Sequence, residues 1–150
     1  ILMIKKKRIS TQLEQEGAEH LVIGNLLRFK IQSFLCPKNF ENYDLIAVNP
    51  KKNMMKKIQV KSRFNKEASS FPLKKVGSDF IVFVKLNCAK RTKGQIIYGY
   101  DSEPEFYIFP TKLCEEYREK TGWYKVLIRN IPDYKSYKNN WKSISKALDM

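Results

Sequence analysis

Four polar residues are spaced so that they could hold a divalent metal against a phosphate group. Glu19 falls within a segment of helical spacing, and Asp44 opens a short apolar run. Gln59 and Lys61 stand two residues apart in an alternating segment, so they project from the same face of a strand. Mg²⁺ takes oxygen ligands, polarises a phosphoryl oxygen and acidifies a water, while a neighbouring lysine positions that water and stabilises transition-state charge. The set therefore predicts phosphodiester hydrolysis.

Each of these residues has an ordinary explanation when it is taken alone. Asp44 could cap a turn, Glu19 could be a solvated helix carboxylate, and Lys61 could be a surface lysine. Together they are better explained by a functional site. Gln59, Lys61 and Arg63 make one whole strand face polar, whereas both neighbours of Gln59 are apolar. A polar face inside such an alternation favours a functional site over a solvated surface.

A helix and a β-hairpin are expected to position this set. Residues 11–30 keep helical spacing, and Glu19 lies at the edge of their apolar arc, from which its side chain can reach over the rim of a sheet. The runs 43–48 and 55–63 flank a turn and predict the two strands of a hairpin. Hairpin partners lie close together, so Asp44 and the polar face of the second strand are predicted to meet at one end of the sheet.

The rest of the chain predicts further strands and helices around this hairpin. Residues 79–86 are almost continuously apolar, which is typical of a strand covered on both faces. A polar loop is expected over 64–78 and a basic turn over 87–94. Strands are expected over 96–98, 105–109 and 124–128, and helices over 111–120 and 134–148. Residues 1–150 are therefore expected to form a single α/β domain, a mixed central β-sheet flanked by helices, with a basic N-terminal arm at about residues 1–9.

The charge of the chain predicts a polyanionic partner. Its net charge is +14, and the stretch from Lys51 to Lys66 contains basic residues but no carboxylate. Such an excess attracts nucleic acid, although a solubilising surface or an anionic membrane would also account for it. The residues expected to contact DNA are Lys51, Lys52, Lys56, Lys57, Arg63, Lys66, Lys90, Arg91 and Lys93.

Composition excludes several other classes of protein. The 3 cysteines are widely and irregularly spaced without a Cys-x-x-Cys pair, and there is 1 histidine, so neither a disulfide framework nor a zinc site is expected. A run of about 18 apolar residues, which a transmembrane helix needs, does not occur. The N-terminal charges follow the apolar residues, which is the reverse of a secretory signal, so a cytoplasmic location and no membrane partner are expected.

The candidate residues also resemble a known family. Gly17-Ala18-Glu19, the run 43–48 (YDLIAV) and the run 58–63 (IQVKSR) resemble, in this order, the core of the PD-(D/E)XK nuclease superfamily. The likeness is greatest to small members of the Holliday-junction-resolvase and intron-homing-endonuclease type. It covers residues of about 10–66, which is under half of the chain.

The resemblance implies a restriction-endonuclease-like core and a role for each matched residue. It implies Mg²⁺ (or Mn²⁺) as cofactor, with Glu19, Asp44 and Val60 as metal ligands. The implied catalytic set is Glu19, Asp44, Gln59 and Lys61. Gln59 departs from the pattern, because most of the superfamily has Asp or Glu there. An amide oxygen ligates without charge, so the site would hold two carboxylates rather than three.

These features together predict a Mg²⁺-dependent DNA endonuclease. Two alternatives remain open: a nucleic-acid-binding module on the same scaffold with weak or lost catalysis, and an adaptor for anionic surfaces. One active centre cuts one strand, so a homodimer or a dimer of dimers is expected. The apolar stripe of the C-terminal segment either forms this interface or packs on the chain's own sheet; its residues are Tyr137, Trp141, Ile144 and Leu148.

Overall fold

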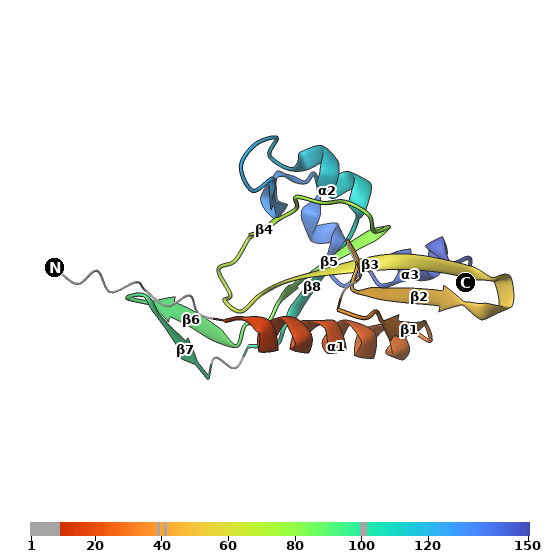
Figure 1. The fold of residues 1–150 in the computed structure, drawn as a ribbon, viewed down its shortest axis with the longest axis horizontal. Coiled ribbons are helices and arrows are strands. Elements are labelled where there is room, and N and C mark those ends of the chain that lie inside the picture. Colours follow the sequence, from red (N-terminus) through yellow and green to blue (C-terminus); the bar gives the residue numbers. More distant parts are fainter. Residues whose placement is uncertain (1–9, 39, 41, 100–101) are drawn as a thin grey trace.

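A computed structural model describes residues 10–38, 40, 42–99 and 102–150; the expected basic arm, residues 1–9, lies outside this part of the chain. Within the described residues a five-stranded central sheet has the order β1-β2-β3-β5-β8 (Figure 1). Its strands are β1 (Gln32–Leu35), β2 (Leu45–Asn49), β3 (Met54–Arg63), β5 (Phe80–Lys85) and β8 (Glu105–Pro110). The β3–β5 pair is parallel and the other pairs are antiparallel, so the expected mixed sheet is confirmed.

The predicted hairpin is formed by β2 and β3. A short 3₁₀ turn, η1 (Pro50–Lys52), and the left-handed residue Asn53 connect the two strands, and Leu45 pairs with Ile58. Burial alternates along both strands, because the residues that face α1 are apolar. The intervening residues of β3 are polar and turn to the opposite face of the sheet, as the sequence predicts.

Helices α1 (Gln12–Arg28) and α3 (Lys142–Ala147) pack on one face of the sheet. Ala18, Val22 and Leu26 form the buried stripe of α1 and contribute to one hydrophobic core with the apolar residues of β2, β3 and β5. This packing holds the N-terminal half of α1 close to the end of the sheet at which β2 begins (Figure 1).

The opposite face carries a second core beneath α2 (Thr111–Tyr117). Strands β4 (Ser70–Pro72) and β9 (Lys125–Leu127) pair there, followed by the 3₁₀ turns η2 (Ile128–Asn130) and η3 (Tyr134–Tyr137). Residues 80–84 of β5 are buried, and they contribute alternately to the two cores, as expected for a strand covered on both faces. Two more strands, β6 (Ala89–Thr92) and β7 (Gln95–Tyr98), form a separate antiparallel hairpin.

Three strands differ from the sequence prediction. The edge strand β1 was not predicted, β4 lies in the expected loop 64–78, and β6 lies in the expected basic turn 87–94. The three cysteines are free thiols, as expected. No helix within the described residues is both long and apolar enough to span a membrane.

The predicted single helix over 134–148 is wrong, and its apolar stripe packs on the chain's own sheet, which is the alternative to an interface. The segment 134–148 is broken into η3 and α3, because Asn139 has a positive φ and donates its backbone N–H to the carbonyl of Phe106 on the sheet. Trp141, Ile144 and Leu148 are buried in the chain's own core. This stripe therefore cannot bind a second copy, and the oligomeric state stays a prediction.

Candidate functional site

Asp44 is fixed at the point where β2 leaves β3. Its backbone N–H donates to the carbonyl of Ile58 over 2.9 Å, and its carbonyl accepts from the N–H of Cys36 over 2.8 Å. Its carboxylate Oδ2 accepts the backbone N–H of Val60 over 2.7 Å. The backbone edge of β3 that β2 no longer covers is therefore occupied by the Asp44 side chain.

Asp44, Gln59 and Lys61 line one cavity of about 230 Å³. Gln59 and Lys61 reach it because they alternate with the buried Ile58 and Val60 on β3. Thr11, Glu14 and Gln15 from the N-terminal end of α1 close one side, and Arg63 and Phe64 extend the cavity along β3. The structure thus brings three of the four predicted catalytic residues together.

Glu19 lies in an adjoining cavity of about 200 Å³, not in the cavity that holds Gln59 and Lys61. The two cavities share Asp44 and Gln15. Burial first, and then the carboxylate of Asp44, raise the pKa of Glu19, so the two carboxylates are close enough to repel. Asp44 therefore links Glu19 to the rest of the predicted set.

Burial shifts the pKa values of the ionisable groups in the site. Burial raises the pKa of Asp44, although the N–H of Val60 and the charge of Lys61 oppose this shift. Burial lowers the pKa of Lys61; the Asp44 carboxylate opposes that change and Arg63 adds to it. Perturbed neighbours of opposite sign in one cavity are typical of functional sites.

The residues of the site fit a hard divalent cation. The Oε1 atom of Gln59 is buried and has no hydrogen-bond partner among the described residues. Residues of a strand direct their N–H and C=O groups to the same side, so the Val60 carbonyl lies on the edge that Asp44 occupies. Among the described residues, no group of three or more His, Cys, Asp or Glu is placed so that it could hold a metal ion by itself. A metal here would bind two carboxylates, the Gln59 amide oxygen and the Val60 carbonyl.

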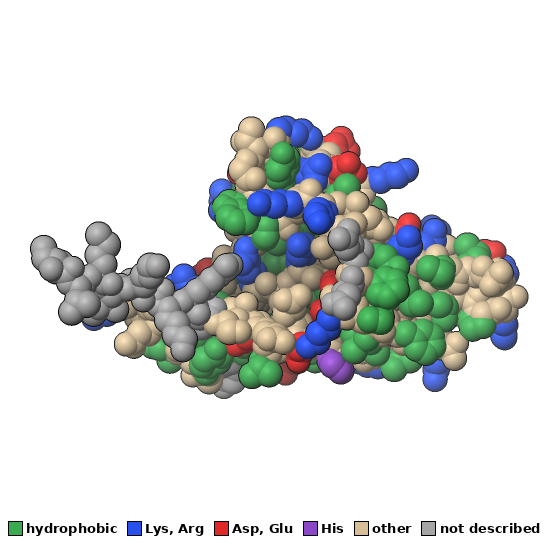
Figure 2. Space-filling model, in the orientation of Figure 1, with side chains coloured by type: hydrophobic (Ala, Val, Ile, Leu, Met, Phe, Trp, Pro, Cys, Tyr) green, Lys and Arg blue, Asp and Glu red, His purple; other side chains and the backbone are tan. Residues whose placement is uncertain are grey.

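The predicted DNA-contacting residues run from the β2–β3 turn along β3 to the β6–β7 hairpin (Figure 1). Lys51 and Lys52 lie in the β2–β3 turn, and Lys52 is paired with Asp149. Lys56 and Lys57 follow on β3, where the Lys57 ammonium lies 5.2 Å from the centre of the Tyr43 ring. At the other end are Arg63, the exposed Lys66, and Lys90, Arg91 and Lys93 of the β6–β7 hairpin. Figure 2 shows Lys and Arg side chains over the part of the molecule formed by α2, β4 and β9, and around the hollow beneath it.

Gln15 was not predicted from the sequence, although it lines both cavities. It stands four residues before Glu19, so the two side chains lie one turn apart on the same side of α1. That spacing was a usable signal, but a single glutamine on a helix is too common to stand out.

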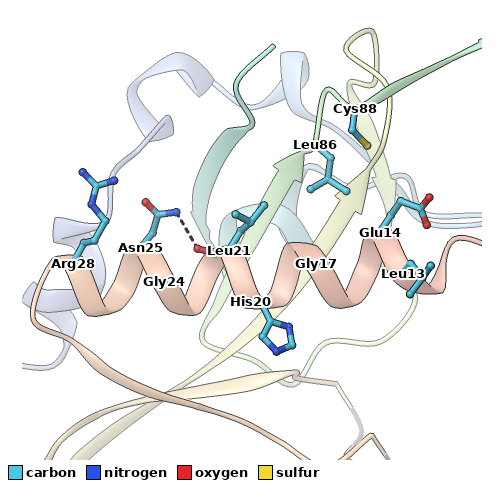
Figure 3. A pocket seen from close by; sticks show the side chains of 10 residues that line it. All are labelled: Leu13, Glu14, Gly17, His20, Leu21, Gly24, Asn25, Arg28, Leu86 and Cys88. Atoms are coloured by element: carbon cyan, nitrogen blue, oxygen red, sulfur yellow. Dashed lines mark hydrogen bonds between the residues drawn. The ribbon is translucent and has the colours of Figure 1, made fainter. Parts of the chain in front are cut away.

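A larger, apolar cavity of about 760 Å³ lies on the other side of α1 (Figure 3). Its lining includes the exposed Leu13 and Leu21 and the small Gly17 and Gly24. The Glu14 carboxylate at its edge already accepts the Tyr98 hydroxyl over 2.8 Å. This cavity gathers no set of acid, base and amide oxygen like that around Asp44, so the smaller cavity is the candidate site.

Comparison with known proteins finds a similar fold. No protein-family model matches the chain, and no curated protein matches it by sequence. Among solved structures, the bacterial homing endonuclease I-Ssp6803I is similar, with a TM-score of 0.58 and 18% identity over 92% of this chain and 94% of that one. The chain therefore has a nuclease-like α/β fold along nearly its whole length.

Proposed function

We propose that the protein is a metal-dependent DNA endonuclease of the PD-(D/E)XK type. One observation carries the proposal: Asp44, the unpartnered amide oxygen of Gln59 and the half-buried Lys61 line one cavity. The similarity in fold to a bacterial homing endonuclease supports it. The basic surface beside the cavity supports DNA as the polyanion.

Each residue of the site has a role in this proposal. Asp44, Glu19, the Gln59 amide and the Val60 carbonyl would hold Mg²⁺ or Mn²⁺. Bound there, the metal would supply Lewis-acid polarisation of the phosphate and a more acidic water. Lys61 orients the attacking water and stabilises the negative charge that develops on the phosphate. Burial of its ammonium strengthens this electrostatic effect, because water screens it less.

Arg63 and Arg91 extend the site toward the DNA backbone. They line a cavity of about 300 Å³ that continues from the catalytic one, since Arg63 and Phe64 line both. The Arg63 Nε–H donates to the carbonyl of Ser70 over 3.1 Å, which fixes its guanidinium at this position. A DNA strand could therefore run from the catalytic cavity past both guanidinium groups.

We also propose that the protein acts as a homodimer or a dimer of dimers. One centre cuts one strand, and a two-fold axis would supply the second centre for a duplex. Sedimentation equilibrium at tens of micromolar, with and without DNA, tests this proposal. A mass of 17.7 kDa without DNA, and one chain per duplex with DNA, would indicate a monomer that nicks one strand.

The alternative is a DNA-binding module without catalysis. It is supported by Gln59, because most of the superfamily has Asp or Glu at this position. Cleavage of a panel of linear and branched DNAs, with Mg²⁺ and with Mn²⁺, separates the two. Wild type should cleave, whereas Lys61→Met should bind DNA without cleaving it. Calorimetric titration with Mn²⁺ should show binding that Asp44→Asn abolishes, because Asn still accepts the Val60 N–H but carries no charge. DNA binding without cleavage or Mn²⁺ binding would favour the alternative.

A further inference from the structure

The β6–β7 hairpin stands apart from the central sheet. It extends beyond the N-terminal end of α1 (Figure 1). Its register pairs Lys90 with Ile97 and Thr92 with Gln95. Lys93 and Gly94 both have positive φ, which is the conformation of the tight two-residue turn that suits twisted strands. The tip is therefore a compact structure and not a long loop.

Contacts at the base of this hairpin fix its position relative to the site. Ala89 is 1% exposed and donates its N–H to the carbonyl of Phe64, which directly follows β3. The Tyr98 hydroxyl donates to Glu14 on α1. Phe64 and Glu14 both line the catalytic cavity. The hairpin is thus anchored to two of the elements that form the site.

The tip itself is exposed and offers donors without a carboxylate. Lys90, Arg91, Thr92, Lys93 and Gln95 are exposed. The side chains of Thr92 and Gln95 have no hydrogen-bond partner among the described residues. Arg91 precedes Thr92 on the strand and so projects from the opposite face of the hairpin, where it lines the basic cavity that continues from the catalytic one. A DNA strand that enters the site therefore passes the tip.

We propose that the β6–β7 tip enters the major groove of duplex DNA next to the cleaved bond, where Gln95 and Thr92 read an A·T pair. This inference rests on the proposed function. Two strands about 4.8 Å apart, with their side chains, fit a groove about 12 Å wide. A glutamine amide matches the N6 and N7 atoms of adenine, and a threonine methyl packs on the thymine methyl. Arg91 contacts phosphate and so positions the tip without reading sequence.

Selection of bound duplexes from a library with a randomised centre, in the absence of divalent metal, tests the proposal. Wild type should select an A·T pair at a fixed position. Gln95→Ala should reduce that preference by roughly tenfold or more, and Gln95→Glu should shift it toward cytosine, whose N4 amino group donates to a carboxylate. Gln32→Ala is the matched control, because Gln32 is an exposed strand glutamine on the edge strand β1.

Three results would overturn the inference: no base preference in the wild type, the same preference in the Gln95 variants, or equal competition by duplex RNA. The RNA result is decisive because the A-form major groove is too narrow to admit the hairpin. Cleavage of the selected duplexes with Mg²⁺ is measured separately. Base preference without cleavage would contradict the proposed function alone, and cleavage without base preference would contradict this inference alone.

Discussion

The carboxylate of Asp44 lies 2.7 Å from the backbone nitrogen of Val60, across a strand edge that no neighbouring strand covers. This contact places the acid between Glu19 on one side and Gln59 and Lys61 on the other. It also favours the charged form of this half-buried acid. The N–H of Val60 stabilises the ionised form that a metal requires, against the cost of burial.

The raised pKa of Glu19 predicts a pH-dependent gain of stability in Glu19→Gln. A carboxyl whose folded-state pKa lies above its unfolded value destabilises the fold once it is ionised in both states. In EDTA at pH 7 the variant should therefore be more stable than wild type. The gain should be under about 1 kcal/mol, since solvent screens this half-exposed group. It should shrink as the pH falls through the raised folded-state pKa toward the ordinary value of 4.5.

Urea denaturation across this pH range measures the effect, and Glu16→Gln is the control with the opposite sign. The hydrogen bond from Lys38 lowers the pKa of Glu16, so its ionised form is favoured by folding and its loss should not stabilise the protein. A gain in stability in both variants would mean that burial of Glu19 and its repulsion by Asp44 are not the cause.

The two tryptophans predict a sharp contrast in stability. Trp141 is 2% exposed and packs against Phe106 with ring centres 5.4 Å apart, whereas Trp123 is 62% exposed. Trp141→Ala should therefore reduce the free energy of unfolding by about 3–5 kcal/mol, because it leaves a cavity in the core. Trp123→Ala loses one contact with Lys74 and should cost less than about 1 kcal/mol. Chemical denaturation followed by circular dichroism measures both losses, and similar values would contradict the packing of Trp141 in the core.

The site hairpin could be predicted from sequence because its signals are local. Gln59 and Lys61 share a face by strand geometry alone, and Asp44 opens the neighbouring strand. The edge strand β1 gives no such signal, since Ser33 is buried while Phe34 and Leu35 are exposed. Apolar periodicity therefore could not reveal which face of this strand packs inward.

The prediction of one long helix over 134–148 was wrong for a different reason. The spacing of Trp141, Ile144 and Leu148 suits one long helix, and all three residues are indeed on the core side. The break before them depends on Asn139, which bonds to β8 across more than thirty residues of sequence. Such a tertiary contact overrides local propensity and is not visible in a short window.

Binding to DNA should weaken steeply with salt. With roughly 5–8 phosphates neutralised, the logarithm of the DNA association constant should fall with the logarithm of the salt concentration at a slope of about −4 to −7.

Arg91→Ala should reduce the magnitude of that slope by about 1, because Arg91 lies on the basic cavity beside the site. Lys52→Ala should change it little, since Lys52 lies in the turn at the far end of the hairpin and is paired with Asp149. Fluorescence anisotropy at several salt concentrations measures all three proteins. An equal effect of both variants would mean that DNA also covers the β2–β3 turn.

Gln59→Glu should lower the stability of the metal-free protein and raise its affinity for a divalent metal. Without metal, the new carboxylate would be buried beside Asp44, so like-charge repulsion and desolvation should lower the free energy of unfolding at pH 7 by about 1–2 kcal/mol. With metal, the third carboxylate should tighten Mn²⁺ binding severalfold, because affinity grows with the charge of the ligand set. In thermal unfolding, the stability deficit of the variant in EDTA should therefore shrink by about 1 kcal/mol in saturating Mn²⁺, since a ligand that binds the folded state stabilises it in proportion to the logarithm of its affinity. Gln15→Glu is a useful comparison, because Gln15 also lines the cavity but is exposed, and it should cost less without metal. If Gln59→Glu lowers the midpoint equally in EDTA and in Mn²⁺, the amide oxygen of Gln59 does not face a metal.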